Sequence, residues 1–417
     1  MSGAEAVFTQ ALGLTPPWEV ERVELKPEQS RIDMFIIYSS NVGQCPVCGA
    51  KDQPVHDHRA RTWQHLHFFQ FEAFVHCDAP RIACTNCSKT TQVGVPWARP
   101  GSHFTLMFEA LALALAREMP VAVCAKTLGC SQNALWRLID AHTTRARARE
   151  SHAGVRELGI DETACRRGHD YVTLVHDLAE RRLLFATPGR GAQTLARAAS
   201  DLRAHGGDPD AIELICMDMS GGFKKGAALY LPNAAIAFDR FHVIQLANAA
   251  VDEVRREEAT YEPHLRRTRW IWLKDTRHWN QDQGAQARRL NAMRLQTARA
   301  WRVKEALRDI YRRRPATDQA ASELSRWMSW ARRCRLEPMK RLAATIKAHW
   351  AGVLHAFGAA HRHTGYVEAV NSLVQAAKAR ARGYATTSHF IAMCYLIAGK
   401  LRHLPSNPYT AALQHTG

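Results

Sequence analysis

Two short apolar runs in the middle of the chain each end in an aspartate. Asp161 follows the run ELGI and Asp218 follows ELICM, so each carboxylate is expected where a buried strand stops. The surrounding pattern predicts three strands in a meander, then a helix, a strand, a short helix and a last strand that ends at Asp239. This part of the chain therefore has the order β-β-β-α-β-α-β.

That order is the ribonuclease-H-like arrangement, in which the first and fourth strands lie side by side. Asp161 and Asp218 are therefore expected to meet at one sheet surface. Two carboxylates so near to each other repel unless cations neutralise their charge. Oxygen ligands of this type suit Mg²⁺ or Mn²⁺. Either aspartate alone is more often a turn or cap residue, but the pair predicts a metal site.

Two CxxC pairs near the start of the chain predict a zinc site. CPVCG holds Cys45 and Cys48, and CTNCS holds Cys84 and Cys87. Each pair can point two sulfurs at one ion, so the two pairs together complete a tetrahedral site for Zn²⁺. The run FFQFEAFVH between them largely alternates as a strand should, so a β-hairpin is expected to bridge the gap.

Other groups in this β-rich head are rival ligands, namely Cys77, His56, His58, His65, His67 and His76. A lone histidine is more often a surface residue, and four unconnected thiols are the simpler alternative to a zinc site. The 11 cysteines of the chain suggest reduced thiols or metal rather than disulfides. The doubled CxxC pattern favours zinc on the four paired cysteines.

A helix-turn-helix is predicted over residues 120–142, PVAVCAKTLGCSQNALWRLIDAH. Ala125 and Leu128 are expected to face inward, Gly129 to make the turn and Ser131 to cap the second helix. That helix would expose three side chains to a major groove of DNA: Gln132, Asn133 and Arg137. A plain helical hairpin without DNA contact is the alternative.

The charge of the chain indicates a polyanionic partner. Its 56 Lys and Arg residues against 39 Asp and Glu give a net charge of +17, which favours nucleic acid first and an anionic membrane surface second. Residues 255–347 alone hold 24 Lys and Arg, 10 Asp and Glu, and six tryptophans. This stretch is interpreted as a basic, aromatic-bearing surface for DNA backbone, with an ordinary helical domain as the alternative.

Targeting and membrane signals are absent from the sequence pattern. The longest apolar runs fall short of the roughly 18 residues that a membrane span needs. The N-terminal residues lack the basic region and apolar core of a secretory signal. With the cysteine usage, this predicts a cytosolic protein.

Over nearly its whole length the chain resembles transposases of bacterial insertion sequences, of the "ISL-three" family with DDE chemistry. The resemblance rests on the two CxxC pairs, TLMFEALALALA, CAKTLGCSQNALWRLI, GIDE, CMDMS, PNAAIAFDRFHV, RWIWLKD and VEAVNSLVQAAKARARGY. It implies a multidomain α+β/α/β protein in the bacterial cytoplasm, associated with the nucleoid. The expected parts are a zinc-binding β-rich head (1–100), a helix-turn-helix domain (101–150), a ribonuclease-H-like core (151–254 and 355–417) and a basic helical insertion (255–354).

The resemblance also implies which residues form the catalytic site. The catalytic and magnesium-binding triad falls on Asp161, Asp218 and Glu368. Asp239 and His242 fall on the motif DRFH as possible accessory residues.

The predicted helix that carries Glu368 has two distinct faces. One is expected to pack on the sheet through Val367, Val370, Val374, Ala377 and Ala381. The other holds Glu368, Asn371, Gln375, Lys378 and Arg382. It places a carboxylate near metal, and Lys378 and Arg382 are expected to contact DNA phosphate.

The implied function is transposition of an insertion sequence. The protein would bind the terminal inverted repeats, cleave the strands with Mg²⁺ or Mn²⁺ and transfer them into target DNA, acting as a homodimer or larger assembly because two ends must be joined. A regulator without catalysis would lack acidic residues at the triad positions. A nuclease or resolvase of the same fold, without strand transfer, stays open from sequence. A serine or tyrosine recombinase is disfavoured because no nucleophile has a comparable context.

Overall fold

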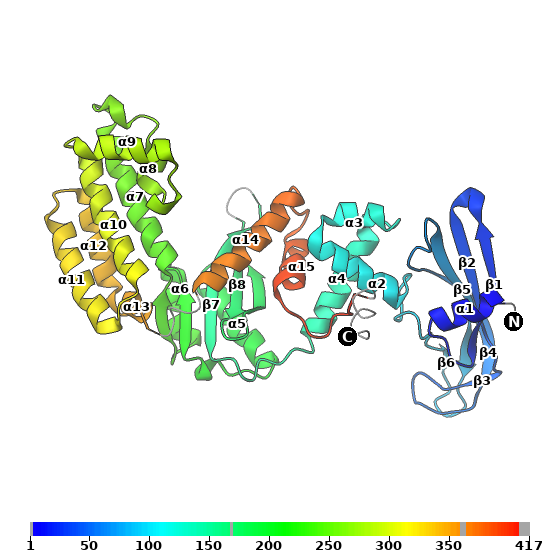
Figure 1. The fold of residues 1–417 in the computed structure, drawn as a ribbon. Coiled ribbons are helices and arrows are strands. Elements are labelled where there is room, and N and C mark those ends of the chain that lie inside the picture. The colour runs from blue at the N-terminus through cyan, green and yellow to red at the C-terminus, as the bar shows by residue number, and fades with distance from the viewer. Residues whose placement is uncertain (1–2, 167–169, 359–363, 408–417) are drawn as a thin grey trace. The chain divides into compact units, whose positions relative to one another are not determined.

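A computed structural model describes residues 3–166, 170–358 and 364–407 (Figure 1). The chain divides into two compact units. One consists of Met1–Arg147, Ala379–Arg382 and Leu401–Gly417, and the other of Ala148–Lys378 and Gly383–Lys400. The finer domain boundaries expected from the sequence remain predictions.

The first unit begins with a sheet of six strands, in which β6 pairs with β5 beside the order β1-β2-β5-β4-β3. The elements are α1 (Gly3–Ala11), β1 (Trp18–Lys26), β2 (Arg31–Tyr38), β3 (Val42–Gly43), β4 (Gln53–Gln64), β5 (Glu72–Ala83) and β6 (Thr90–Gln92). The antiparallel pair β4–β5 is the hairpin predicted between the two CxxC pairs. Alternate residues of β5 are buried, and they pack with Trp18, Trp63 and Trp97 to form the core of the head.

Three helices follow the head: α2 (Leu106–Glu118), α3 (Val121–Thr127) and α4 (Gln132–Arg147). The predicted turn between α3 and α4 is confirmed. Ala125 and Leu128 are buried, and the Ser131 hydroxyl accepts a hydrogen bond from the Ala134 N–H at 3.2 Å. Gly129 has φ +65°, where a Cβ would lie 2.4 Å from a Glu72 carboxylate oxygen. Glycine is therefore the residue that this turn accommodates without strain.

The second unit is built on a sheet of five strands in the order β11-β10-β7-β8-β9. The strands are β7 (Glu157–Ala164), β8 (Tyr171–Asp177), β9 (Arg182–Pro188), β10 (Leu214–Met217) and β11 (Ala235–Phe238). The first three form an antiparallel meander, whereas β10 runs parallel to β7 and β11 parallel to β10. The predicted neighbourhood of the first and fourth strands is therefore confirmed.

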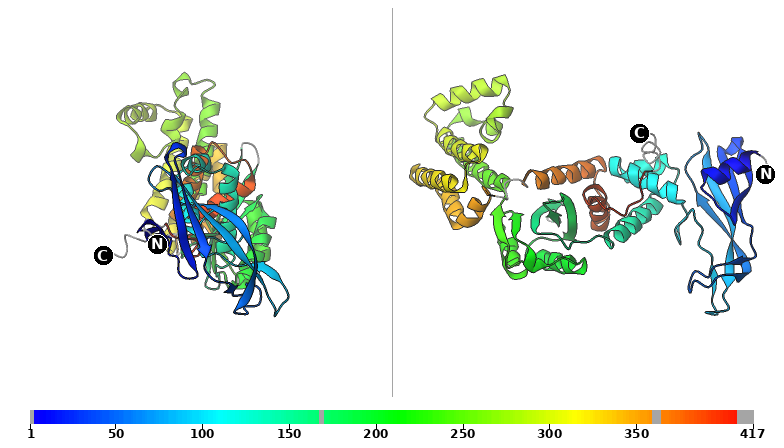
Figure 2. Two further views of the ribbon diagram at one scale, coloured as in Figure 1. Left: turned by 90° about the vertical axis from the view of Figure 1, so that its right-hand side faces the viewer. Right: turned by 60° about the horizontal axis from the view of Figure 1, so that its bottom comes forward.

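Helices cover both faces of this sheet, as the right-hand view of Figure 2 shows. They are α5 (Ala192–Ala204), α6 (Gly221–Tyr230), α14 (Thr364–Arg380) and α15 (Thr387–Ala398). Leu158 and Ile160 point into the larger core, which includes Leu195 of α5. Between them Gly159 faces α14, where a Cβ would lie 2.7 Å from a methyl of Val367. Successive residues of β7 thus serve opposite faces, as the strand pleat requires.

Most of residues 240–355 form a helical bundle that shares the larger core with the sheet. Its helices are α7 (Arg240–Glu258), α8 (Arg269–Leu273), α9 (Gln281–Ala292), α10 (Gln296–Arg313), α11 (Thr317–Arg333), α12 (Glu337–Ala348) and α13 (Trp350–His355). Of its six tryptophans before residue 347, Trp270 and Trp330 are exposed and the other four are buried or half-buried. The aromatic part of the predicted basic surface is therefore limited to Trp270 and Trp330, because the other four rings contribute to the core of the bundle.

The described ranges hold no helix that combines the length and the apolar character needed to cross a lipid bilayer.

Candidate active site and metal centres

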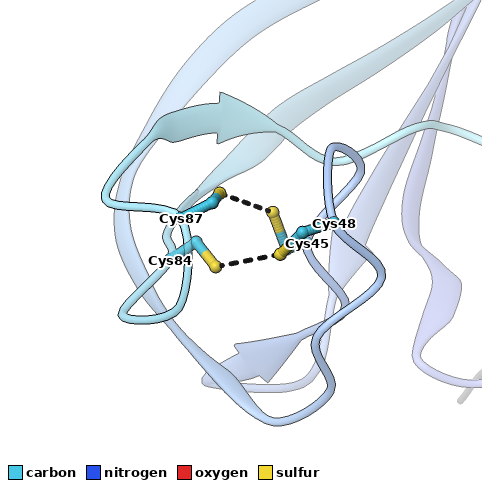
Figure 3. Close-up of side chains that lie close together, drawn as sticks. All are labelled: Cys45, Cys48, Cys84 and Cys87. Atoms are coloured by element: carbon cyan, nitrogen blue, oxygen red, sulfur yellow. Dashed lines mark hydrogen bonds between the residues drawn. The ribbon is translucent and has the colours of Figure 1, made fainter.

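The four paired cysteines converge from two turns of the head (Figure 3). The sulfur atoms of Cys45 and Cys87 lie 3.8 Å apart, and those of Cys48 and Cys84 lie 3.5 Å apart. Four sulfurs bound tetrahedrally at ~2.3 Å from a zinc ion lie about 3.8 Å from one another. The cluster therefore has the size and ligand chemistry of a structural zinc site.

Local hydrogen bonds favour the thiolate form of Cys45 and Cys48, whereas burial raises the pKa of Cys87 to about 12. The pKa of Cys48 is lowered to about 6, chiefly by a backbone hydrogen bond from Ala50. The predicted rival ligands lie outside the cluster within the described residues. Burial in the head raises the pKa of Cys77 to about 12, and the His76 ring is bonded to Asp33 at 2.6 Å.

Three aspartates lie on neighbouring parallel strands, two of them directly after β10 and β11; the expectation that a strand stops at Asp161 is wrong, because β7 continues to Ala164 through its pairing with β8. Asp161 lies on β7, Asp218 follows β10 and Asp239 follows β11. The strand ladder continues to this edge, because the Asp239 N–H donates to the Met217 carbonyl at 3.0 Å. The two aspartates that the strand order singled out are therefore joined by a third, from the motif DRFH.

The pKa of Asp161 reflects its burial and the nearby carboxylates. Its pKa is raised to about 6, chiefly by burial and further by the charges of Asp239 and Asp218. A backbone hydrogen bond from Glu162 and the charge of His242 act in the opposite direction. The His242 Nε2 lies 4.0 Å from an Asp161 carboxylate oxygen. A buried carboxylate among others is stabilised in its charged form by a nearby cation.

Each of the three carboxylates is held by the backbone that follows it. One oxygen of Asp161 accepts from the Glu162 N–H at 2.7 Å. The corresponding bonds run from Ser220 to Asp218 at 2.8 Å and from Phe241 to Asp239 at 2.9 Å. These bonds orient carboxylates that are carried by the rigid sheet, which suits residues that must hold a ligand in place.

The polar face of α14 lies along β7. Asn371 donates to the second oxygen of Asp161, Gln375 donates to the Thr163 hydroxyl, and Lys378 donates to the Ala164 carbonyl at 2.6 Å. The apolar face packs as predicted, because Val367, Val370, Val374 and Ala377 are all buried.

Two details of this helix differ from the sequence prediction. The helix ends at Arg380, so the half-buried Ala381 and the exposed Arg382, which has φ +56°, lie beyond it. Lys378 is predicted to contact DNA phosphate, but its ammonium group donates to the carbonyl of Ala164 on β7. The polar face of the helix therefore ends before Arg382, the second residue predicted to contact DNA phosphate.

Glu368 lies one turn before Asn371 and is exposed. Within the described ranges it makes no hydrogen bond or ion pair, and it forms no set with Asp161 and Asp218 whose ligand atoms all lie within 4.8 Å of one another. Three glutamates of the helical insertion are alternative candidates for the third acid, and each has a structural partner: Glu305 pairs with Arg308, Glu323 with Arg313 and Glu337 with Lys340. The role of Glu368 stays a prediction.

Two residues near Asp161 have surroundings that the sequence did not predict. Glu162 lies directly after Asp161, and its pKa is raised chiefly by burial and then by the charge of Asp218. Asn371 was placed on the polar face of its helix, but its contact with Asp161 was not predicted. The motif GIDE was the available signal for Glu162, whereas the contact of Asn371 depends on how α14 packs.

The predicted DNA-reading residues of the helix-turn-helix lie at the start of α4. Gln132, Asn133 and Arg137 are exposed, whereas Leu135 and the neighbouring Leu138 are buried. The helix thus presents polar side chains on the side opposite its core.

Comparison with known sequences identifies the class of protein. A family profile of the ISL3 type described as "Transposase" matches residues 158–394, which is more than half of the chain. The "Helix-turn-helix domain of transposase family ISL3" matches residues 94–143, and the "zinc-finger of transposase IS204/IS1001/IS1096/IS1165" matches residues 41–87. The chain belongs to the ISL3 family of transposases.

Similar proteins extend this likeness over nearly the full length. The chain is 27% identical to the transposase for insertion sequence element IS1557 of Mycobacterium tuberculosis, over 96% of this chain and 97% of the relative. It is 24% identical to the transposase for insertion sequence element IS1001 of Bordetella parapertussis, over 91% of this chain and 95% of the relative.

These matches support three statements about the chain. The zinc-finger match and the four-cysteine cluster support a structural Zn²⁺. The helix-turn-helix and transposase matches indicate DNA binding. Membership of a transposase family implies a nucleotidyl-transfer or endonuclease activity.

Proposed function

We propose that this chain binds the terminal inverted repeats of a bacterial insertion sequence and catalyses metal-dependent strand cleavage and strand transfer. The observation that carries the proposal is the row formed by Asp161 on β7, Asp218 after β10 and Asp239 after β11, with the pKa of Asp161 raised to about 6. Membership of the ISL3 family supports the same reading. We infer a ribonuclease-H-like core, because the strand order β11-β10-β7-β8-β9 supports it.

The residues at this edge suit a hard divalent cation. Asp161, Asp218 and Glu368 would hold Mg²⁺ or Mn²⁺, since carboxylate oxygens are the preferred ligands of both ions. The amide oxygen of Asn371 is buried and has no hydrogen-bond partner within the described residues. That unused acceptor, beside the crowded carboxylates, supports a positively charged occupant. When bound, such ions supply the charge that activates a nucleophilic oxygen and stabilises the reacting phosphodiester.

The protein residues provide the positioning. Backbone N–H groups after each strand orient one oxygen of Asp161, Asp218 and Asp239, and the Asn371 amide holds the other oxygen of Asp161. His242 lies close enough to offset part of the negative charge at Asp161. A preorganised set of this kind costs little reorganisation during the reaction. In the strand-transfer step the freed 3′-hydroxyl of the element would attack a phosphodiester of target DNA and displace a 3′-hydroxyl of the target strand, so no covalent protein intermediate is needed.

DNA recognition is divided among several surfaces in this proposal. Gln132, Asn133 and Arg137 of α4 would read the terminal repeats in a major groove, assisted by the zinc-binding head. The exposed Arg382 is a candidate for phosphate contact, whereas Lys378 would have to leave its carbonyl partner. At least two copies of the chain would act together, because two element ends must be joined.

The helical insertion is the proposed DNA-backbone surface. The longest run of basic residues in the insertion is Arg312, Arg313 and Arg314, but Arg312 pairs with Asp275 and Arg313 with Glu323. Among the insertion's exposed cations that have no ion pair in the described part of the chain, three lie together at the end of α11 and just beyond it: Arg332, Arg333 and Arg335. These three are the better candidates for phosphate contact.

Replacing Arg332, Arg333 and Arg335 by glutamine is expected to weaken binding to all DNA sequences alike. The slope of log K against log salt should flatten by roughly one unit per lost phosphate contact. Fluorescence anisotropy over a salt series measures that slope. Arg313→Gln is the matched control, because its guanidinium is committed to Glu323 and its loss should leave the slope unchanged. An unaltered slope in the triple variant would remove this surface from the account.

Joining assays test the proposed reaction. Purified full-length chain with labelled terminal-repeat DNA, target DNA and Mg²⁺ is expected to yield both cleaved ends and DNA joined to the target. A nuclease of the same fold would give cleaved ends without joined product. That outcome would replace strand transfer by hydrolysis as the function of the site.

A further inference from the structure

A second cluster of metal-binding side chains lies in the catalytic unit, away from the aspartates. It consists of His152, Asp201 and His205, and one ligand atom from each lies within 4.8 Å of the others. His152 precedes β7, whereas Asp201 and His205 come from the end of α5. All three are largely shielded: His152 is 2% exposed, and the side chains of Asp201 and His205 are 13% and 11% exposed. Neither the family match nor the acidic site accounts for this cluster.

The spacing on α5 places two of the ligands together. Asp201 and His205 are four residues apart, so they project from the same face of the helix one turn from each other. His205 is the residue that ends the helix. The carbonyl end of a helix carries partial negative charge, which favours a cation there. The Asp201 carboxylate adds to that charge.

A hydrogen bond at Nδ1 of the His205 ring leaves Nε2 as the nitrogen that can bind a metal. The Nδ1 atom lies 2.8 Å from the Asp201 carbonyl oxygen and 3.6 Å from an Asp201 carboxylate oxygen. A carbonyl only accepts, so Nδ1 carries the hydrogen and Nε2 keeps its lone pair. Metal-binding histidines usually donate their other ring N–H to a carbonyl or carboxylate in this manner, because the bond fixes the ring and its tautomer. His205 therefore has the support that a ligand needs.

His152 is tied to the same place by its backbone. Its N–H donates to the His205 carbonyl at 2.9 Å, and the two imidazole rings lie 4.6 Å apart at 24°. Two imidazoles and one carboxylate form a donor set for a borderline first-row ion, with zinc the usual occupant and one position left for water.

We propose that His152, Asp201 and His205 bind a second Zn²⁺, distinct from the four-cysteine site. The ion joins the segment that leads into β7 to the end of α5, so it stabilises the start of the catalytic unit. This site is independent of the proposed strand transfer, because its ligands lie outside the row of aspartates.

Metal stoichiometry tests the proposal. Untagged full-length chain, stripped with a chelator and dialysed against Zn²⁺ in excess Mg²⁺, is expected to retain about two zinc ions, one at each site. The excess Mg²⁺ occupies the oxygen ligands of the aspartate site. His205→Gln and Asp201→Asn should each reduce the content to about one. His278→Gln, which alters an exposed histidine on the helical insertion, should leave two.

A second measurement separates lost binding from lost folding. Co²⁺ on the four cysteines gives a thiolate charge-transfer band, which should persist in both variants while the second equivalent disappears. If His205→Gln does not fold, the wild-type stoichiometry and Asp201→Asn decide. One zinc in the wild-type chain, or two zinc ions retained by folded Asp201→Asn, would show that the histidine pair only packs and would overturn the proposal.

Discussion

Glu368→Gln is expected to fold and to bind terminal DNA normally, yet to lose both strand cleavage and joining by at least about 100-fold. The side chain is exposed and makes no hydrogen bond or ion pair within the described residues, so its removal costs the fold little. It lies in the first turns of α14, one turn before the Asn371 that holds Asp161. The change keeps the shape and removes the charge that a cation would bind. Single-turnover cleavage of labelled ends in Mg²⁺ measures the loss.

Glu337→Gln is the matched control for this substitution. Glu337 is an exposed glutamate near a helix start, like Glu368, but it lies in the helical insertion and pairs with Lys340. Its replacement should leave both steps near the wild-type rate. If Glu368→Gln cleaves at that rate while Asp161→Asn does not, the third acid must be sought elsewhere, with Glu162 the nearest alternative.

Cys84→Ser is expected to release one zinc ion and to loosen residues 40–100. The four sulfurs come from two turns that the ion joins, and apparent binding energies of structural zinc sites are of order 10–16 kcal/mol. Losing one ligand therefore removes much of the energy that orders these turns. Metal analysis and limited proteolysis of the full chain report the two effects. Strand chemistry at Asp161 should not depend directly on this site, because its residues belong to the other compact unit.

Cys130→Ser is the corresponding control, since Cys130 lies near the turn of the helix-turn-helix and outside the cluster. It should keep the zinc and the protease resistance of the wild-type chain. A wild-type protein without zinc, in which all thiols of the head titrate freely, would contradict the zinc assignment.

Local sequence patterns predicted much of this architecture. The neighbourhood of β7 and β10 followed from the order of strands and helices, which leaves few ways to arrange the chain. The turn at Gly129 and the cap at Ser131 followed from residue chemistry that acts over a few positions. The four cysteines could be paired because their spacing carries the geometry of the metal site.

Contacts between distant segments escaped prediction for a physical reason. Whether Arg313 faces solvent or Glu323 depends on how two helices pack, which charge counts do not contain. The same holds for Asn371, whose partner Asp161 lies 210 positions earlier in the chain. His152 and His205 were not singled out in the sequence, because only the course of the chain into β7 brings them together. The burial of four of the six tryptophans could not be predicted either, since an aromatic residue in a basic segment packs in a core as readily as it lies on a surface.

The most direct test replaces Asp161 on β7 and Asp218 directly after the neighbouring strand β10. Full-length wild-type chain, Asp161→Asn and Asp218→Asn are incubated with labelled terminal-repeat DNA, target DNA and Mg²⁺, and cleaved and joined products are quantified beside the Kd for the same DNA. The account predicts Mg²⁺-dependent cleavage and joining by the wild-type chain, and a loss of both by at least about 100-fold in each variant at unchanged Kd. Cleavage and joining at the wild-type rate by either variant, or no Mg²⁺-dependent product from the wild-type chain, would contradict it.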